Sequence, residues 1–230
     1  MSKLEVIVLN EEDARVADAS GADRLELVSA IHEGGLTPDF HVIEKVLRAV
    51  SIPVQVMIRL HSKSFYYQPD ELHSMVEQVR TIVEMGGGGI VFGSLSNEGK
   101  LDLPSLTEIV QSAKGQSITF HRAIDVSDDP VALCKGIFHS GLNIDRILTS
   151  GGRSEVSKGM DTIDEMREIE KMGGPIVMPG SGLTVDNIGK IHSKLKAREY
   201  HVGSGVRHHG SYDLGIDSKK VMEIKRVITS

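Results

Sequence analysis

Eight short apolar runs recur along the chain at intervals of 20 to 35 residues, and this recurrence constrains the fold more than any other feature. The runs cover residues 4–9, 24–28, 54–61, 89–93, 117–121, 146–149, 175–179 and 199–203. The segments between them carry helical patterns. Strands that alternate with helices at this spacing form right-handed β–α–β units and a parallel sheet.

Eight such units in 230 residues predict a single-domain (β/α)8 TIM barrel that spans residues 1–230. Helix-start signals stand at Asn10, Pro69, Pro104, Pro130 and Thr184, and helix-ending glycines at Gly21, Gly86, Gly141 and Gly173. An open, doubly wound sheet of eight strands is the alternative. The barrel is favoured because no glycine-rich dinucleotide fingerprint follows the first run.

Charge and cysteine content narrow the function classes. The net charge of −6 argues against a nucleic-acid binder and against a protein that binds anionic membranes. The single Cys134 cannot form an internal disulfide, and its apolar helical neighbours indicate a core residue. No apolar run approaches 18 residues, so we expect a cytoplasmic protein.

Strand alternation predicts which side chains face the barrel interior. In the third run, Val54, Val56, Ile58 and Leu60 form an apolar face that should meet the helices, so Gln55, Met57, Arg59 and His61 should point inward. The same alternation predicts an unusually polar interior, composed of Glu5, Arg24, Glu26, Gln55, Arg59, Thr119, His121, Glu199 and His201.

Position along each strand separates two roles for these polar groups. Glu5, Arg24 and Glu199 start their strands, so we expect them to form structural ion pairs at the barrel bottom. Late residues lie at the carboxyl end, where TIM barrels carry their active sites. In an enzyme, Glu26 and His121 would exchange protons there. Arg59 and Arg122 would stabilise an oxyanion, and Asp125 would orient His121. The alternative is a hydrogen-bond network that caps the core.

Two Gly-Ser-Gly loops follow the seventh and eighth runs, where TIM barrels frequently build phosphate sites. Gly180, Ser181 and Gly182 form the first, and Gly203 and Ser204 begin the second. Glycine lets an anion approach the backbone closely. We therefore predict a small anionic ligand; a pair of tight turns is the alternative. The aromatic segment 62–69 is either a lid over this pocket or an exposed loop.

Several motifs in fixed order resemble the CutC family, which is named for copper homeostasis. They are GADRLELV at 21–28, EGGLTP at 33–38, FHRAIDV at 120–126, RILTSGG at 146–152 and EYHV at 199–202. The resemblance runs from about residue 4 to residue 203. It implies a cytoplasmic TIM barrel that forms a homo-oligomer and is linked to copper.

The resemblance therefore sets a metal-handling protein beside the enzyme hypothesis. Copper would be the ion, and His61, His121 and His201 would be its ligands, with Met57 as a further donor. Family members often carry cysteines where this chain has Ile7 and Val28. Because soft thiolates select Cu(I), their absence argues against direct Cu(I) carriage.

Overall fold

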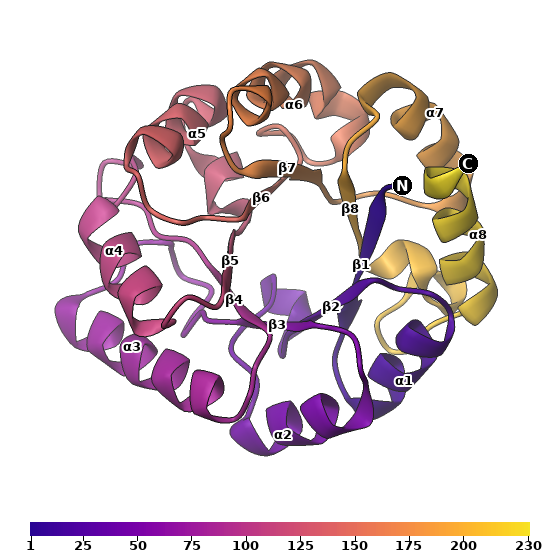
Figure 1. Cartoon of the computed structure of the whole chain (residues 1–230), viewed down its shortest axis with the longest axis horizontal. Helices are drawn as coiled ribbons and strands as arrows, with labels where there is room; N and C mark the ends of the chain where they lie inside the picture. The colour runs from indigo at the N-terminus through magenta and orange to yellow at the C-terminus, as the bar shows by residue number, and fades with distance from the viewer.

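The computed structural model describes the whole chain, residues 1–230, as a ring of helices around a barrel of parallel strands (Figure 1). The strands are β1 (Lys3–Val8), β2 (Arg24–Leu27), β3 (Val54–Met57), β4 (Gly89–Phe92), β5 (Ser117–Phe120), β6 (Arg146–Thr149), β7 (Ile176–Pro179) and β8 (Glu199–Val202). The helices are α1 (Glu11–Ala19), α2 (Phe40–Ala49), α3 (Pro69–Glu84), α4 (Leu103–Ser112), α5 (Pro130–His139), α6 (Val156–Lys171), α7 (Val185–Leu195) and α8 (Ser218–Thr229). Short 3₁₀ segments lie at Ile31–Glu33, Arg122–Val126, Ser204–Val206 and His208–Gly210.

The sheet order confirms the TIM barrel and excludes the doubly wound alternative. Each strand pairs in parallel with its sequence neighbour from β1 to β7, and β8 returns to pair with β1. The seam between β7 and β8 is bridged by the pair Gly180 and His201. Closing the ring in this way brings the first and last strands together, so the inward-facing side chains of β1, β2 and β8 become neighbours.

Local chemistry fixes the helix ends as predicted. The Asn10 side chain accepts a hydrogen bond from the Asp13 amide at 2.9 Å and caps α1. Pro69 and Pro130 are the first residues of α3 and α5. The residues after the ends of α1 and α3, Gly21 and Gly86, have φ values of +92° and +84°, which favour glycine.

The predicted faces of the strands are confirmed. Val54, Val56 and Ile58 are buried in the large core between strands and helices. Inside the barrel, a small separate cluster consists of Ile7, Val28, Met57 and Val91. All nine predicted interior polar residues are buried, at 7% exposure or less.

The third run is shorter than expected, which corrects the predicted position of His61. β3 ends at Met57. The backbone of Arg59 forms its hydrogen bonds with Thr37 and not with a neighbouring strand. The Arg59 amide donates to Thr37 Oγ1 at 2.8 Å, and the Arg59 carbonyl accepts from the Thr37 amide at 2.9 Å. Strand alternation therefore stops before Leu60 and His61. His61 does not point into the barrel but lies against Glu71 of α3, with Nε2 3.2 Å from Oε1.

Ion pairs fill the barrel bottom, as predicted. Arg24 bridges Glu5 on β1 and Glu199 on β8, and its Nη2 is 2.5 Å from Glu199 Oε2. Arg146, which the sequence reading did not place inward, adds a contact of 3.0 Å to the same carboxylate. Two guanidinium groups and two carboxylates thus balance each other in a buried layer that joins four strands.

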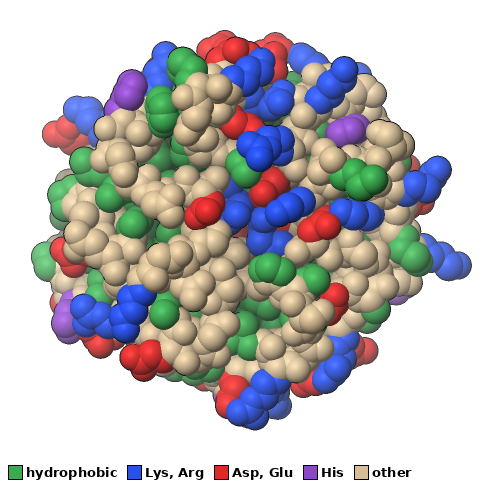
Figure 2. Space-filling model, viewed as in Figure 1, with side chains coloured by type: hydrophobic (Ala, Val, Ile, Leu, Met, Phe, Trp, Pro, Cys, Tyr) green, Lys and Arg blue, Asp and Glu red, His purple; other side chains and the backbone are tan.

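The exterior shows charges of both signs. On the face drawn in Figure 2, Lys and Arg side chains lie beside Asp and Glu side chains at the centre and around the rim. This face therefore offers no continuous positive surface. No helix combines the length and the apolarity needed to cross a bilayer.

The ion-pair layer generates a stability prediction. Arg24→Met should lower the free energy of unfolding by about 3–5 kcal/mol, because it removes the guanidinium shared by two buried carboxylates and leaves Glu5 with only His201 and Glu199 with only Arg146. The control Arg80→Met removes an exposed pair with Glu77 and should change it by no more than about 0.5 kcal/mol. Urea denaturation measures both values, and equal losses would contradict the assignment.

Candidate active site

A cavity of about 280 Å³ opens at the carboxyl ends of the strands. The predicted site residues that border it are Glu26, Arg59, His121, Arg122, His201, Ser181, Gly182, Gly203 and Ser204. Aliphatic side chains, among them Ile7, Val28 and Met57, form the remainder of its inner wall. The cavity therefore combines titratable groups with apolar side chains, as catalytic pockets do.

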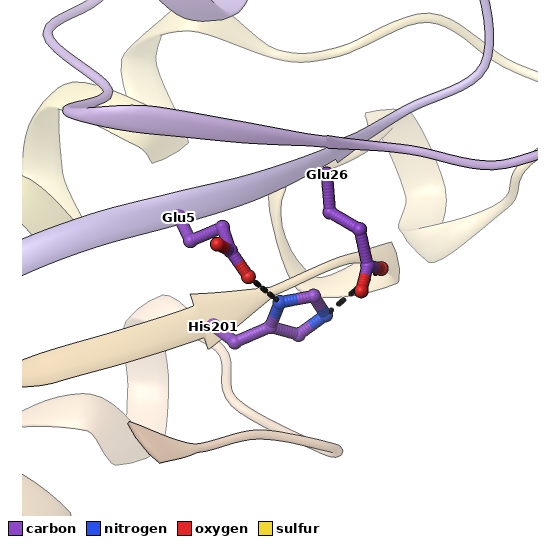
Figure 3. Close-up of side chains that lie close together, drawn as sticks. All are labelled: Glu5, Glu26 and His201. Atoms are coloured by element: carbon purple, nitrogen blue, oxygen red, sulfur yellow. Dashed lines mark hydrogen bonds and ion pairs between the residues drawn. The ribbon is translucent and has the colours of Figure 1, made fainter. Parts of the chain in front are cut away.

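A chain of three side chains leads from the ion-pair layer to the cavity (Figure 3). Glu5 Oε1 lies 2.8 Å from His201 Nδ1, and His201 Nε2 lies 3.7 Å from Glu26 Oε2. Arg24 holds the other oxygen of Glu5. Because Glu5 is fixed from below, the imidazole is oriented and its second nitrogen faces Glu26.

Glu26 is the group of this chain best placed to exchange a proton. It is 2% exposed, and its Oε1 has no hydrogen-bond partner. Burial raises the pKa of Glu26 to about 7, because it disfavours the charged carboxylate; the Glu5 charge adds to this, while His201 opposes it. The pKa of His201 is raised: burial disfavours its protonated form, but the Glu26 and Glu5 carboxylates outweigh burial.

His121 is held as a neutral imidazole. Its Nδ1 accepts a hydrogen bond from the Ala123 amide at 3.1 Å, so the ring proton is on Nε2. Nε2 is buried without a partner, and the ring borders the cavity. Burial, together with the Arg59 charge, lowers the pKa of His121 to about 3. At neutral pH His121 is therefore a hydrogen-bond donor, not a cation.

Arg59 supplies a buried positive charge at the same wall. Its Nη1 donates to the backbone carbonyls of Glu33, Gly34 and Gly35 at 3.3–3.4 Å, and its Nε has no partner. The guanidinium carbon lies 4.5 Å from the centre of the Phe65 ring. That ring is 5.0 Å from the ring of His121, so Phe65 from the 62–69 loop covers both groups.

Asp125 has a role different from the one predicted. It does not contact His121, whose Nδ1 is occupied by a backbone amide. Its carboxylate instead accepts from Arg122 Nε at 2.7 Å, from Thr149 Oγ1 at 2.5 Å and from the Ser150 and Gly152 amides. Asp125 therefore joins the loops after β5 and β6 and fixes Arg122 at the cavity mouth.

The two Gly-Ser-Gly loops border the cavity, but their glycines lie against protein atoms. A Cβ on Gly203 would lie 2.0 Å from Tyr212 Oη, and one on Gly182 would lie 2.8 Å from Glu155 Cβ. The Ser181 hydroxyl donates to the Ser154 carbonyl at 2.9 Å. Gly180 packs against Leu148 and His201 and does not border the cavity.

The three histidines predicted as metal ligands do not form one site. His61 pairs with Glu71, His201 with Glu5, and His121 with a backbone amide. Three groups that do converge are Glu5, Glu26 and His201, whose donor atoms lie within 4.8 Å of one another.

This donor set does not fit the copper that the family name implies. Two carboxylates and an imidazole are hard or borderline ligands, whereas Cu(I) prefers thiolate and thioether sulfur. The one cysteine, Cys134, is buried in α5, and burial raises the pKa of its thiol to about 12. Glu5 is moreover already neutralised by Arg24.

Tyr212 and Phe65 belong to the site but carried little sequence signal. Tyr212 lies in the segment after β8, which has no strand or helix period, and its hydroxyl covers Gly203. The guanidinium carbon of Arg207, whose charge is paired with Asp13, lies 4.7 Å from the centre of its ring. The aromatic character of segment 62–69 indicated Phe65 only as part of a candidate lid.

Barrel and cavity together define a (β/α)8-barrel protein whose titratable groups gather at the carboxyl ends of the strands. The CutC family model matches residues 2–206, and the chain belongs to this family. It is 36% identical to a CutC family protein of Enterobacter sp. (strain 638) over 205 residues, which are 89% of this chain and 81% of the relative. A relative from Salmonella heidelberg (strain SL476) is 35% identical and is matched over 90% of this chain and 81% of its own.

A solved structure agrees with this assignment. The chain resembles the crystal structure of the putative copper homeostasis protein CutC from Streptococcus agalactiae with a TM-score of 0.80. The two are 26% identical, and the match covers 88% of this chain and 98% of the other.

The environment of His121 generates a spectroscopic prediction. Its imidazole should remain in the neutral Nε2–H form from pH 8 down to about pH 4, because its pKa is lowered to about 3. Nitrogen-15 NMR of labelled protein measures this. In the unfolded protein the ring should titrate at about 6.5. Because the unfolded chain then binds this proton more readily than the folded one, the free energy of unfolding should decrease as the pH falls from about 6.5 toward about 3. A midpoint near 6.5 in the folded protein would contradict the prediction.

Proposed function

We propose that this chain is an enzyme that moves a proton within a small anionic metabolite, at a carbon next to a carbonyl group. The observation that carries this proposal is the buried carboxyl of Glu26, with a pKa raised to about 7 and an unpartnered oxygen in a cavity that also holds a neutral imidazole donor. A general base works best when its pKa lies near the working pH.

The residues take complementary roles in such a reaction. Ionised Glu26 removes the proton from carbon, and the electron pair of the broken C–H bond moves to the carbonyl oxygen. His121 Nε2–H donates a hydrogen bond to that developing oxyanion, and the Arg59 charge stabilises it. Glu26 then delivers the proton to that oxygen, so the C–H and C=O bonds of the substrate become the C=C and O–H bonds of its enol. The step is an isomerisation, so it balances without a further reactant.

His201 and Glu5 support this base from below. The imidazole faces Glu26 across 3.7 Å and stabilises its ionised form. Glu5, itself held by Arg24, lies 2.8 Å from His201 Nδ1 and keeps the imidazole in this orientation. We further propose a homo-oligomer in the cytoplasm.

Deuterium exchange tests the reaction. A mixture of small carboxylated and phosphorylated metabolites is incubated with the protein in D2O and analysed by mass spectrometry. Wild type should label a metabolite, and Glu26→Gln should lower the rate by about 100-fold or more. The rate should rise with pH through about 7, since only ionised Glu26 accepts a proton.

The control is Glu77→Gln, which changes an exposed carboxylate on α3. It should label as fast as wild type. Labelling that survives in Glu26→Gln, or a rate independent of pH between 6 and 8, would refute the role of Glu26. If no metabolite is labelled, the reaction class is refuted.

Copper handling is the competing function suggested by the name of the Streptococcus agalactiae relative. We expect only weak Cu(I) binding, because neither Ile7 nor Val28 offers sulfur and the Cys134 thiol is buried. Competition against a Cu(I) chelator measures this. Cys134→Ser should leave the result unchanged. Stoichiometric binding at about nanomolar affinity or tighter would favour the copper function instead.

A further inference from the structure

Four arginines are buried in this protein, and one of them lacks an acidic partner. Arg24 and Arg146 pair with Glu199, and Arg207 pairs with Asp13 at 2.5 Å. Arg59 is equally buried, at 7% exposure, yet it pairs with no carboxylate: its guanidinium donates to backbone carbonyls, lies over the Phe65 ring and is close to the Tyr67 hydroxyl. A buried charge without a counter-ion is costly, so the fold retains Arg59 against its own stability.

The surroundings of Arg59 identify what would compensate the charge. Arg59 borders the cavity, and so does His121, whose Nε2 is buried without a partner. Arg122 stands at the mouth, but Asp125 already balances its charge. Arg59 is therefore the guanidinium at the cavity that has no ion-pair partner, and a single carboxylate group would supply one.

The opposite wall disfavours a larger, doubly charged group. The backbone of Gly203 is covered by the Tyr212 hydroxyl, and Glu155 lies against Gly182 with Oε2 3.1 Å from the Cβ position. On the side where a Cβ would stand, both glycines are thus already covered by protein atoms, which reduces the room for a bulky phosphoryl group beside them.

We propose that Arg59 is the receptor for a carboxylate group, and that the metabolite of this enzyme is a small monocarboxylate with a carbonyl next to its reacting carbon. The guanidinium plane matches two carboxylate oxygens. The wall of Ile7, Val28 and Met57 takes the apolar remainder. This inference rests on the proposed function for the reacting carbon, but the anion subsite stands on Arg59 alone.

Direct binding of two probes tests the subsite. Pyruvate and inorganic phosphate are titrated into the full chain by calorimetry at pH 7.5. Pyruvate should bind with a dissociation constant of about a millimolar, and phosphate should not bind up to about 50 mM. Arg59→Met should weaken pyruvate binding by about ten-fold or more. Arg59→Lys keeps the charge but loses the planar fork, so it should bind with intermediate affinity.

A matched control keeps the result interpretable. Arg80→Met alters an exposed arginine on α3 and should bind pyruvate as wild type does. Circular dichroism of each variant shows whether it is folded. If Arg59→Met does not fold, Arg59→Lys alone decides.

The outcomes separate clearly. Phosphate that binds wild type and still binds Arg59→Met would place the anion at the Gly-Ser-Gly loops and overturn the proposal. Phosphate binding that is lost in Arg59→Met would overturn the preference for carboxylate. Binding of neither probe would overturn the subsite. Pyruvate binding that depends on Arg59, in a protein that labels no metabolite in D2O, would support the subsite and refute the proposed reaction.

Discussion

The bridge that Arg24 makes between Glu5 and Glu199 is the interaction on which the cavity depends. It joins β1, β2 and β8 where the barrel closes. It also keeps Glu5 ionised, because burial, which raises the pKa of that carboxyl, is outweighed by the Arg24 charge. Ionised Glu5 then orients His201, and His201 faces Glu26. A structural ion pair at the bottom of the barrel thus sets the geometry around Glu26, the group that we propose exchanges a proton.

The buried charges of this barrel are treated in two ways. Those at the bottom form a neutral layer, and such a layer can hold strands in register without calling for a ligand. The charged groups at the mouth lack some of their partners: Glu26 Oε1 has no hydrogen-bond donor, and Arg59 pairs with no carboxylate. Sites built for a ligand are expected to be less satisfied than sites built for stability. Inside the barrel, the unsatisfied atoms of Glu26, Arg59 and His121 therefore lie at the cavity, and Gln55 Oε1 is the exception.

Much of the fold could be predicted from the sequence, because strand alternation is a local property. It correctly assigned the inward faces of Glu5, Glu26 and His201. It failed at His61, since the bonds between Arg59 and Thr37 end β3 early, and such bonds between distant segments leave no local pattern. The role of Asp125 failed for the same reason: apart from Arg122, its partners lie 24 to 27 residues away, at the end of β6 and in the loop that follows it. The missing counter-ion of Arg59 is likewise visible only in three dimensions.

Two positions show how the chemistry of the cavity follows from its lining. Ile7 and Val28 occupy the two positions at which the resemblance to the family implies cysteine, and both border the cavity. Ile7 is the register partner of Glu26 across β1 and β2, so the two side chains share one face. Aliphatic groups there exclude water from the carboxyl, and this desolvation is the main cause of its raised pKa. A thiol at the same place would be smaller, more polarisable and able to bind a soft metal. In this chain the two aliphatic side chains instead keep water away from Glu26. Its pKa therefore lies at about 7, where a carboxyl group can both accept and release a proton.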